Sequence, residues 1–424
     1  MSDTTPQNAP DAASSGLIGS GQEGSVMDQC RAWLARVRNG DMGALPAIAG
    51  LVVLGILFTL LSPYFLTERN FANLVTQAAT LVMLAMALVF VILLGEIDLS
   101  AGVTSGVAMC LFVVLSAPGG SALHWLLALA LALLAGTAIG AVIGFFVARV
   151  RIPSFVVTLG LFLGFQGLEL ILIGSGGVYR ITTPAILAIM NSNLPDWGGW
   201  LMLAVVLGVT AIGALRERAR RSRAGITNRT IHLLWIKLGA MLVLGGAVVL
   251  ALNQNRGGVA MVSGVPIVAP ITLVILWAGT FVLDRTRFGR YIYAIGGNAE
   301  AARRAGIKVV MIRWCAFMVC STLAVVSGLF SASKVGSVDA AFGRDIVLSG
   351  VAAAVVGGVS LFGGRGRLLQ AAIGALVVAI ITNGLGLLNL PGGVNYLVTG
   401  GVLILAATVD ALSRARSGGS ASRA

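Results

Sequence analysis

Residues 285–313 read RTRFGRYIYAIGGNAEAARRAGIKVVMIR and lie between two apolar segments of membrane-spanning length. The stretch carries seven Lys and Arg residues. Basic residues are retained on the cytoplasmic side of a membrane during insertion. The stretch therefore predicts a cytoplasmic loop between two membrane spans.

Within this loop, residues 298–306 carry the start and stop signals of a short helix. Asn298 is a good N-cap, and Glu300 falls in the first turn, where the helix dipole favours a carboxylate. Gly306 can adopt the left-handed conformation that closes a helix. A short rigid helix of low profile suits docking of a partner, although a capped turn between two spans is the alternative. The residues that we assign to this site are Gly296, Gly297, Asn298, Glu300, Ala301, Ala302, Arg303 and Gly306.

Composition places the chain in a membrane. Its 424 residues are 57% hydrophobic and 11% charged, and the mean hydropathy is +0.95. A soluble domain carries about twice that charged fraction. We predict an all-α, polytopic transmembrane helical bundle with no soluble enzyme domain. The net charge of +13 is explained by basic residues on the cytoplasmic side, so we expect no nucleic acid partner.

Charge also predicts the topology. With roughly 10–12 spans and both termini cytoplasmic, 24 of the 29 Lys and Arg residues lie inside. We predict a disordered cytoplasmic N-terminal segment (1–44), a transmembrane domain (45–411) and a cytoplasmic C-terminal tail (412–424). The apolar segments fall at 46–62, 72–94, 99–116, 123–147, 154–174, 197–214, 238–254, 267–284, 314–332, 346–361, 368–388 and 394–411. Those at 99–116 and 346–361 are short and rich in glycine, which is typical of re-entrant or broken helices.

Two kinds of chemistry are not expected from this sequence. The four cysteines form no CxxC pair and there are only two histidines, so we expect no metal, no cofactor and no catalytic residue. No lysine follows a glycine, so the chain has no Walker A loop and cannot itself be a P-loop ATPase.

Polar residues inside apolar segments mark candidate functional positions. Glu96 and Asp98 interrupt a long apolar run, where carboxylates are costly, and a polar connection at the membrane surface is the plain alternative. Gln166 and Glu169 lie on one face of a predicted helix. An unpaired Glu in lipid costs about 2–3 kcal/mol or more, so we expect Glu169 to face a cavity or a partner.

Small residues predict where helices touch. Gly136, Gly140 and Gly144 recur every four residues, which favours close packing inside the subunit, with a dimer interface as the alternative. Gly357, Gly358 and Ser360 belong to the run GVAAAVVGGVSLFGGRGR and predict a tightly packed, broken helix.

Several motifs together resemble one family. Glu300-Ala301-Ala302-x-x-x-Gly306 resembles the cytoplasmic loop of ATP-binding-cassette importer permeases. The run GRYIYAIGGNAEAARRAGI, with GEIDLSAGVTSGV, RIPSFVVTLG and GGVSLFGG, is similar to the bacterial sugar permeases of the ribose and xylose branch. The resemblance covers about residues 45–411, and the extra pair of spans around 197–254 is most like the D-xylose branch. The chain departs from the family at Gln166-Gly167, where Arg-Gly is usual, and over 333–350.

The resemblance implies a permease subunit of an ATP-driven importer of D-xylose or a related monosaccharide in the bacterial inner membrane. It implies a coupling helix at 298–306 that enters a cleft on a separate ATPase subunit, a periplasmic sugar-binding protein, a permease homodimer and surrounding membrane lipid. The residues that it places in the translocation pathway or its architecture are Glu96, Asp98, Ser100, Gly102, Gln166, Glu169, Gly357, Gly358 and Ser360.

Two other classes remain open from the residues alone. An ion-coupled secondary transporter of a small polar solute needs an ionisable residue within the membrane, and Glu169 is the clear candidate. An integral-membrane enzyme needs a convergent set of nucleophile, base or metal ligands, and the sequence offers none.

Overall fold

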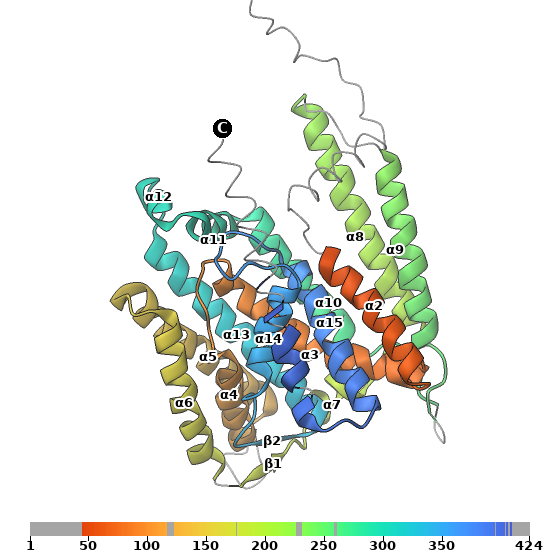
Figure 1. Ribbon diagram of the computed structural model, residues 1–424, viewed down its shortest axis with the longest axis horizontal. Coiled ribbons are helices and arrows are strands. Elements are labelled where there is room, and N and C mark those ends of the chain that lie inside the picture. The colour runs from red at the N-terminus through yellow and green to blue at the C-terminus, as the bar shows by residue number, and fades with distance from the viewer. Residues whose placement is uncertain are drawn as a thin grey trace, which may run out of the picture. The chain divides into compact units, whose positions relative to one another are not determined.

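The computed structural model describes residues 45–116, 123–174, 176–225, 231–257, 261–394, 396–402, 404–405 and 408 (Figure 1). The predicted tails at 1–44 and 412–424 lie outside the described residues. The described part is almost entirely helical, as predicted, with one two-stranded sheet. The α-helices are α2 (Leu45–Leu61), α3 (Glu68–Ile92), α4 (Ala101–Ser116), α5 (Trp125–Gly144), α6 (Ser154–Ile173), α7 (Pro184–Asn191), α8 (Asp196–Arg223), α9 (Ile231–Leu252), α10 (Val268–Arg285), α11 (Arg287–Gly297), α12 (Ala299–Arg304), α13 (Val309–Val335), α14 (Ile346–Val356) and α15 (Leu368–Leu387).

Eight of these helices are long and apolar enough to cross a membrane, and three shorter apolar helices accompany them. Together the eight and the three match eleven of the twelve predicted segments, while 394–411 lies partly outside the described residues. The short α4 and α14 occupy the two segments that we expected to be re-entrant or broken. The 11 residues of α14 span only about 16 Å, about half the thickness of a bilayer core. The side on which the termini lie stays a prediction.

Helix α3 forms the centre of the bundle. Its last turns, from Ala78 to Ile92, are buried on every side, as expected for a helix that is apolar all round. Thr67 caps its start by accepting a hydrogen bond from the backbone N–H of Asn70 at 3.3 Å. Helices α13, α14 and α15 pack against it, so that these four helices hold the main core.

The glycine series of α5 packs against α13. A Cβ built on Gly140 would lie 2.6 Å from the carbonyl oxygen of Phe317, and one on Gly136 would lie 2.3 Å from Val325. A Cβ built on Gly144 would lie 2.6 Å from Cδ1 of Trp314. Packing inside the subunit, the favoured interpretation of this series, is therefore confirmed.

Several short elements were not predicted, among them α11, a small sheet and α7. Strands β1 (Val178–Arg180) and β2 (Ser337–Asp339) pair antiparallel, with Tyr179 opposite Val338. Helix α7 is fixed to α13 by Ser333, whose hydroxyl donates to the carbonyl oxygen of Ile186 at 2.6 Å. Figure 1 places this sheet at the end of the bundle opposite α12.

The segment Leu203–Ala247 forms a compact unit of its own, and the other described residues form the second unit. The smaller unit contains most of α8 and α9, the additional pair of spans that the sequence predicted. Within it, Leu203 lies against Gly245.

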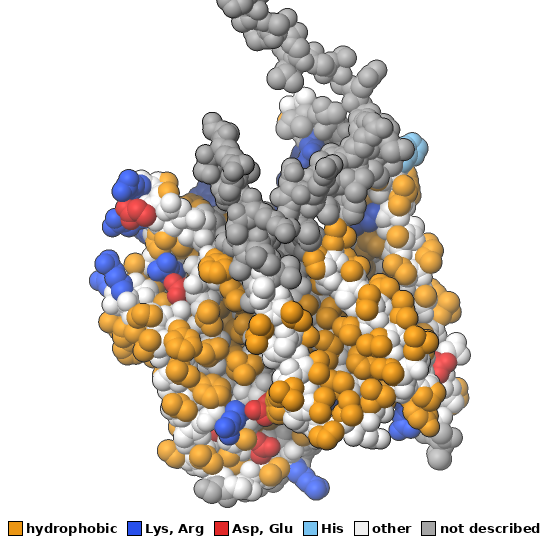
Figure 2. All heavy atoms as spheres, viewed as in Figure 1, with side chains coloured by type: hydrophobic (Ala, Val, Ile, Leu, Met, Phe, Trp, Pro, Cys, Tyr) orange, Lys and Arg blue, Asp and Glu red, His pale blue; other side chains and the backbone are white. Residues whose placement is uncertain are grey.

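The surface is apolar to an extent that is unusual for a protein in water. Figure 2 shows hydrophobic side chains over much of the visible face. Among the exposed large hydrophobic side chains of the described residues, Leu60 and Ile171 are each 80% exposed. Soluble monomers rarely expose apolar patches larger than a few hundred Å². The outer surface is thus suited to contact with lipid.

Candidate functional site

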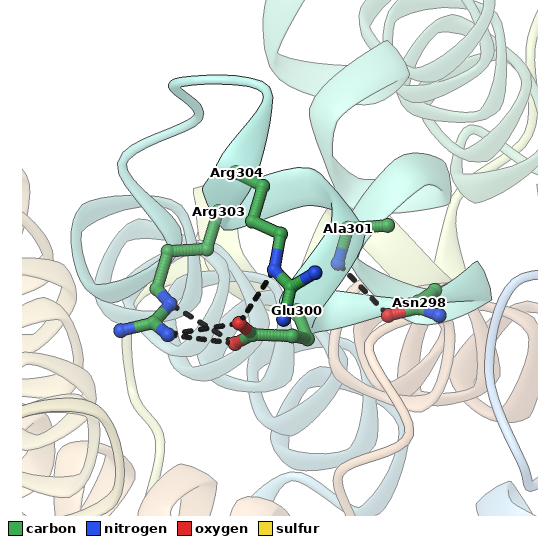
Figure 3. A network of polar contacts seen from close by, with 5 residues as sticks. All are labelled: Asn298, Glu300, Ala301, Arg303 and Arg304. Atoms are coloured by element: carbon green, nitrogen blue, oxygen red, sulfur yellow. Dashed lines mark hydrogen bonds and ion pairs between the residues drawn. The ribbon is translucent and has the colours of Figure 1, made fainter.

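Helix α12 has the caps that its sequence predicted. The side chain of Asn298 accepts a hydrogen bond from the backbone N–H of Ala301 at 2.9 Å (Figure 3). Gly306 closes the helix with φ +82°, in the left-handed region. The predicted boundaries and both end signals are therefore confirmed.

The exposed side of α12 carries a charged cluster of Glu300, Arg303 and Arg304. Glu300 accepts hydrogen bonds from the guanidinium groups of Arg303 at 2.9 and 3.0 Å and of Arg304 at 3.0 Å (Figure 3). These bonds lower the pKa of the Glu300 carboxyl, so the ion pairs are complete above its ordinary pKa and are lost only as the pH falls through the lowered value. At neutral pH the cluster is fully charged and open to a partner, whereas Ala302 is buried.

Helix α11 precedes α12 and is amphipathic. Ile292 and Ile295 are buried, while Arg287 and Arg290 lie outside the core. The hydroxyl of Tyr293 donates to the carbonyl oxygen of Gly366 at 2.8 Å. Burial, with a contribution from the charge of Asp284, raises the pKa of Tyr293 to about 12, so this donor stays protonated at physiological pH.

The end of α11 touches two other glycine-containing loops. A Cβ on Gly296 would lie 1.8 Å from the carbonyl oxygen of Leu93 and 2.5 Å from the backbone nitrogen of Gly364. The N–H of Gly364 itself donates to Leu93 at 2.8 Å, and Gly363 lies against Gly95. We call Leu93, Gly95, Gly296, Gly363 and Gly364 the glycine junction. It brings the end of α11 into backbone contact with the loop before α4 and with the loop after α14.

The loop 95–100 is held firmly beside the junction. Glu96 pairs with Arg313, at the start of α13, with 3.4 Å between Oε1 and Nε. Asp98 is fully buried and accepts bonds from the backbone N–H of Ser100 at 2.9 Å and from its hydroxyl at 2.6 Å. The backbone N–H of Ile97 donates a hydrogen bond to the hydroxyl of Ser154 in α6 at 3.2 Å. The hydroxyl of Thr158, also in α6, donates to the carbonyl oxygen of Ile97 at 3.3 Å. This geometry fits the architectural part of the predicted role for Glu96, Asp98 and Ser100.

The remaining predicted glycines are positions of close approach. A Cβ on Gly102 would lie 2.2 Å from the carbonyl oxygen of Gly343, and one on Gly357 would lie 2.0 Å from that of Gln370. Gly358 has φ +96°, in the left-handed region. Ser360 is buried, and its backbone N–H donates to the backbone carbonyl oxygen of Arg365 at 3.0 Å. Helix α14 ends at Val356, so the predicted break in this segment is confirmed.

Glu169 faces the interior of the bundle, as predicted. It is 0% exposed, and neither carboxylate oxygen has a hydrogen-bond partner among the described residues; the same holds for Nε2 of Gln166. A Cβ on Gly106 of α4 would lie 2.0 Å from Oε1 of Glu169 and 2.3 Å from the carbonyl oxygen of Phe342. Glu169 therefore lies against α4, apart from the glycine junction.

The sequence did not indicate a role for Leu93, Tyr293 or Arg313. Leu93 and Tyr293 connect α11 to the loops before α4 and after α14, and Arg313 connects α13 to the loop before α4. Their contacts are long-range, and two of them use backbone carbonyl oxygens, which leave no trace in side-chain patterns. Among the described residues no group of His, Cys, Asp or Glu side chains could hold a metal ion.

These observations define a multi-pass helical membrane protein in which an exposed charged helix is joined through backbone contacts to loops between the spans. The chain belongs to the family described as "Branched-chain amino acid transport system / permease component", whose model matches residues 70–407.

The chain is similar to three named permeases over most of its length. It is 35% identical over 377 residues to the xylose transport system permease protein XylH of Escherichia coli (strain K12), covering 87% of this chain and 92% of the relative. For XylH of Haemophilus influenzae the identity is 32%, with 82% and 90% covered. For the ribose import permease protein RbsC of Escherichia coli (strain K12) it is 30%, with 90% and 95% covered. No solved structure matches the chain.

Proposed function

We propose that this chain is the permease subunit of an ATP-driven sugar importer in the bacterial inner membrane, with D-xylose or a related monosaccharide as cargo. The observation that carries the proposal is the capped, charged helix α12 and its attachment through Gly296 to the loops that precede α4 and follow α14. The similarity to xylose and ribose permeases supports the choice of cargo.

In this proposal a separate ATPase subunit binds α12 through Glu300, Arg303 and Arg304. Movement of α12 and α11 on ATP binding passes through the glycine junction to α4 and α14, the two short helices inside the bundle. A periplasmic sugar-binding protein delivers the sugar, and two permease subunits form the membrane part. Hydrolysis of ATP is assigned to the ATPase, because the chain has no Walker A loop.

A second candidate is a secondary transporter driven by an ion gradient. The observation that favours it is Glu169, a fully buried carboxyl within an apolar helix and without a hydrogen-bond partner among the described residues. This alternative explains the burial of Glu169 in α6. It does not explain why an exposed charged helix, α12, is connected through the glycine junction to the loops before α4 and after α14.

Substitution of Gly306 by valine tests the docking role of α12. At φ +82° a β-branched residue costs about 1–2 kcal/mol and redirects the chain after α12. A Cβ there meets no described atom within 4 Å, so we expect Gly306→Val to insert and fold normally. We expect the ATPase to co-purify poorly with it and sugar uptake to fall by about tenfold or more.

The matched control is Gly164→Val in α6, where a Cβ is also free of contacts within the described residues and the backbone is helical. Normal uptake and co-purification by Gly306→Val would mean that 298–306 is only a connection between spans, and the importer proposal would lose its main support.

A further inference from the structure

A cavity of about 180 Å³ lies between α4, α13 and the residues that link β2 to α14. Three serines line it: Ser105 from α4, and Ser327 and Ser331 from α13. Phe342 supplies an apolar wall, and the carboxylate of Asp345 lies at the exposed edge. None of the predicted pathway residues lines it.

The hydrogen bonds of this wall leave it rich in acceptors. The hydroxyl of Ser105 donates its only proton to the carbonyl oxygen of Gly102 at 2.6 Å, and that of Ser327 donates to Thr80 at 2.8 Å. Each oxygen keeps lone pairs for a ligand. Asp345 is an acceptor too, and the hydroxyl of Tyr396 donates to its Oδ2 at 3.1 Å. A ligand that fits this wall therefore brings several O–H or N–H donors.

The size of the cavity and the charges of its lining residues further restrict the class of ligand that it can bind. The cavity, about 180 Å³ in volume, has room for a ligand the size of one sugar ring. No Lys or Arg is among the lining residues, so a carboxylate or phosphate finds no partner and meets the charge of Asp345. An amino acid would bring such a carboxylate, whereas a neutral monosaccharide brings hydroxyl donors and an apolar face for Phe342.

The walls are fixed by backbone contact. A Cβ on Gly343, which has φ +81°, would lie 2.2 Å from the carbonyl oxygen of Gly102, and one on Gly328 would lie 2.8 Å from Cβ of Ser105. The cavity is thus built where α4 meets both α13 and the loop after β2. Figure 1 places β2 at the end of the bundle opposite α12.

We infer that this cavity is an acceptor site for one neutral monosaccharide within a single permease subunit. The sugar is held by the serine hydroxyls and Asp345, with its apolar face against Phe342. The loop that carries Gly95 of the glycine junction leads directly into α4, and α4 supplies Ser105 to the cavity wall. Movement of the junction is therefore expected to alter the cavity walls. The inference rests on the proposed function for the source of the sugar, but binding itself requires neither the ATPase nor the binding protein.

The test measures binding of D-xylose to the purified full-length permease in lipid nanodiscs by saturation-transfer difference NMR, which detects weak binding. We expect transfer to D-xylose and none to L-leucine. Ala341→Trp, at the exposed edge, fills the cavity and should abolish the transfer. Ser105→Ala combined with Ser331→Ala should weaken the affinity by about tenfold, as expected for two lost hydrogen bonds.

The control is Ser321→Ala, which removes a buried hydroxyl from α13 on the side that faces Gly140 and away from the cavity lining. It should bind D-xylose as the unmodified chain does. Absence of transfer to D-xylose in the unmodified chain, or equal transfer in Ala341→Trp, would overturn the inference.

Uptake by the complete importer separates this inference from the proposed function. Equal uptake by Ala341→Trp and the unmodified chain would refute the acceptor site alone. Failure of the unmodified assembly to import sugar would refute the proposed function, and the binding result would still stand.

Discussion

Gly296→Ala should abolish ATP-driven uptake, although it adds a single methyl group. That methyl would lie 1.8 Å from the carbonyl oxygen of Leu93 and 2.5 Å from the backbone nitrogen of Gly364. Both obstacles are backbone atoms, so no side-chain rotation relieves them, and the hydrogen bond that joins Gly364 to Leu93 must open. Disruption of this kind costs about 1–3 kcal/mol and falls on the contact between the end of α11, the loop before α4 and the loop after α14.

The measurement compares sugar uptake with the amount of inserted permease. We expect near-normal insertion and ATPase binding, because α12 itself is unchanged, but loss of uptake. Gly386→Ala in α15 is the control, since its Cβ meets no described atom within 4 Å. Full uptake by Gly296→Ala would show that the glycine junction does not transmit movement.

Gly140→Val should have the largest effect on stability. Even the first added carbon would lie 2.6 Å from the carbonyl oxygen of Phe317 and 2.8 Å from Cα of Met318. Helices α5 and α13 must then separate, and within lipid such close packing is a main source of helix association. We expect a loss of about 3 kcal/mol or more, seen as aggregation or a lower Tm in detergent.

Gly160→Val in α6 is the matched control for that experiment, because its Cβ has free space among the described residues. A monodisperse Gly140→Val protein with an unchanged Tm would show that the packing of α5 on α13 is looser than the backbone distances imply.

The sequence predicted features that depend on local chemistry. The ends of α12 follow from Asn298 and Gly306, because capping and left-handed closure are properties of a few neighbouring residues. The burial of Glu169 follows from the cost of a carboxylate in lipid. The break after Val356 follows from paired glycines.

Features that depend on long-range contact could not be predicted. The contact of Gly296 with Leu93 joins residues about 200 positions apart through backbone atoms, which no periodicity records. The serine-lined cavity escaped notice for a similar reason. Ser105 and Ser331 are ordinary small residues in apolar helices, and only the packing of α4 on α13 shows that they face one space.

The central claim is that ATP, and not an ion gradient, drives uptake through this chain. The most direct measurement is uptake of radiolabelled D-xylose into proteoliposomes that contain the permease, its ATPase and its binding protein. We expect uptake that requires ATP, persists when proton and sodium gradients are collapsed by ionophores, and is lost in Gly296→Ala. Uptake by the permease alone that needs a gradient, ignores ATP and disappears in Glu169→Leu would contradict the importer and establish the secondary transporter.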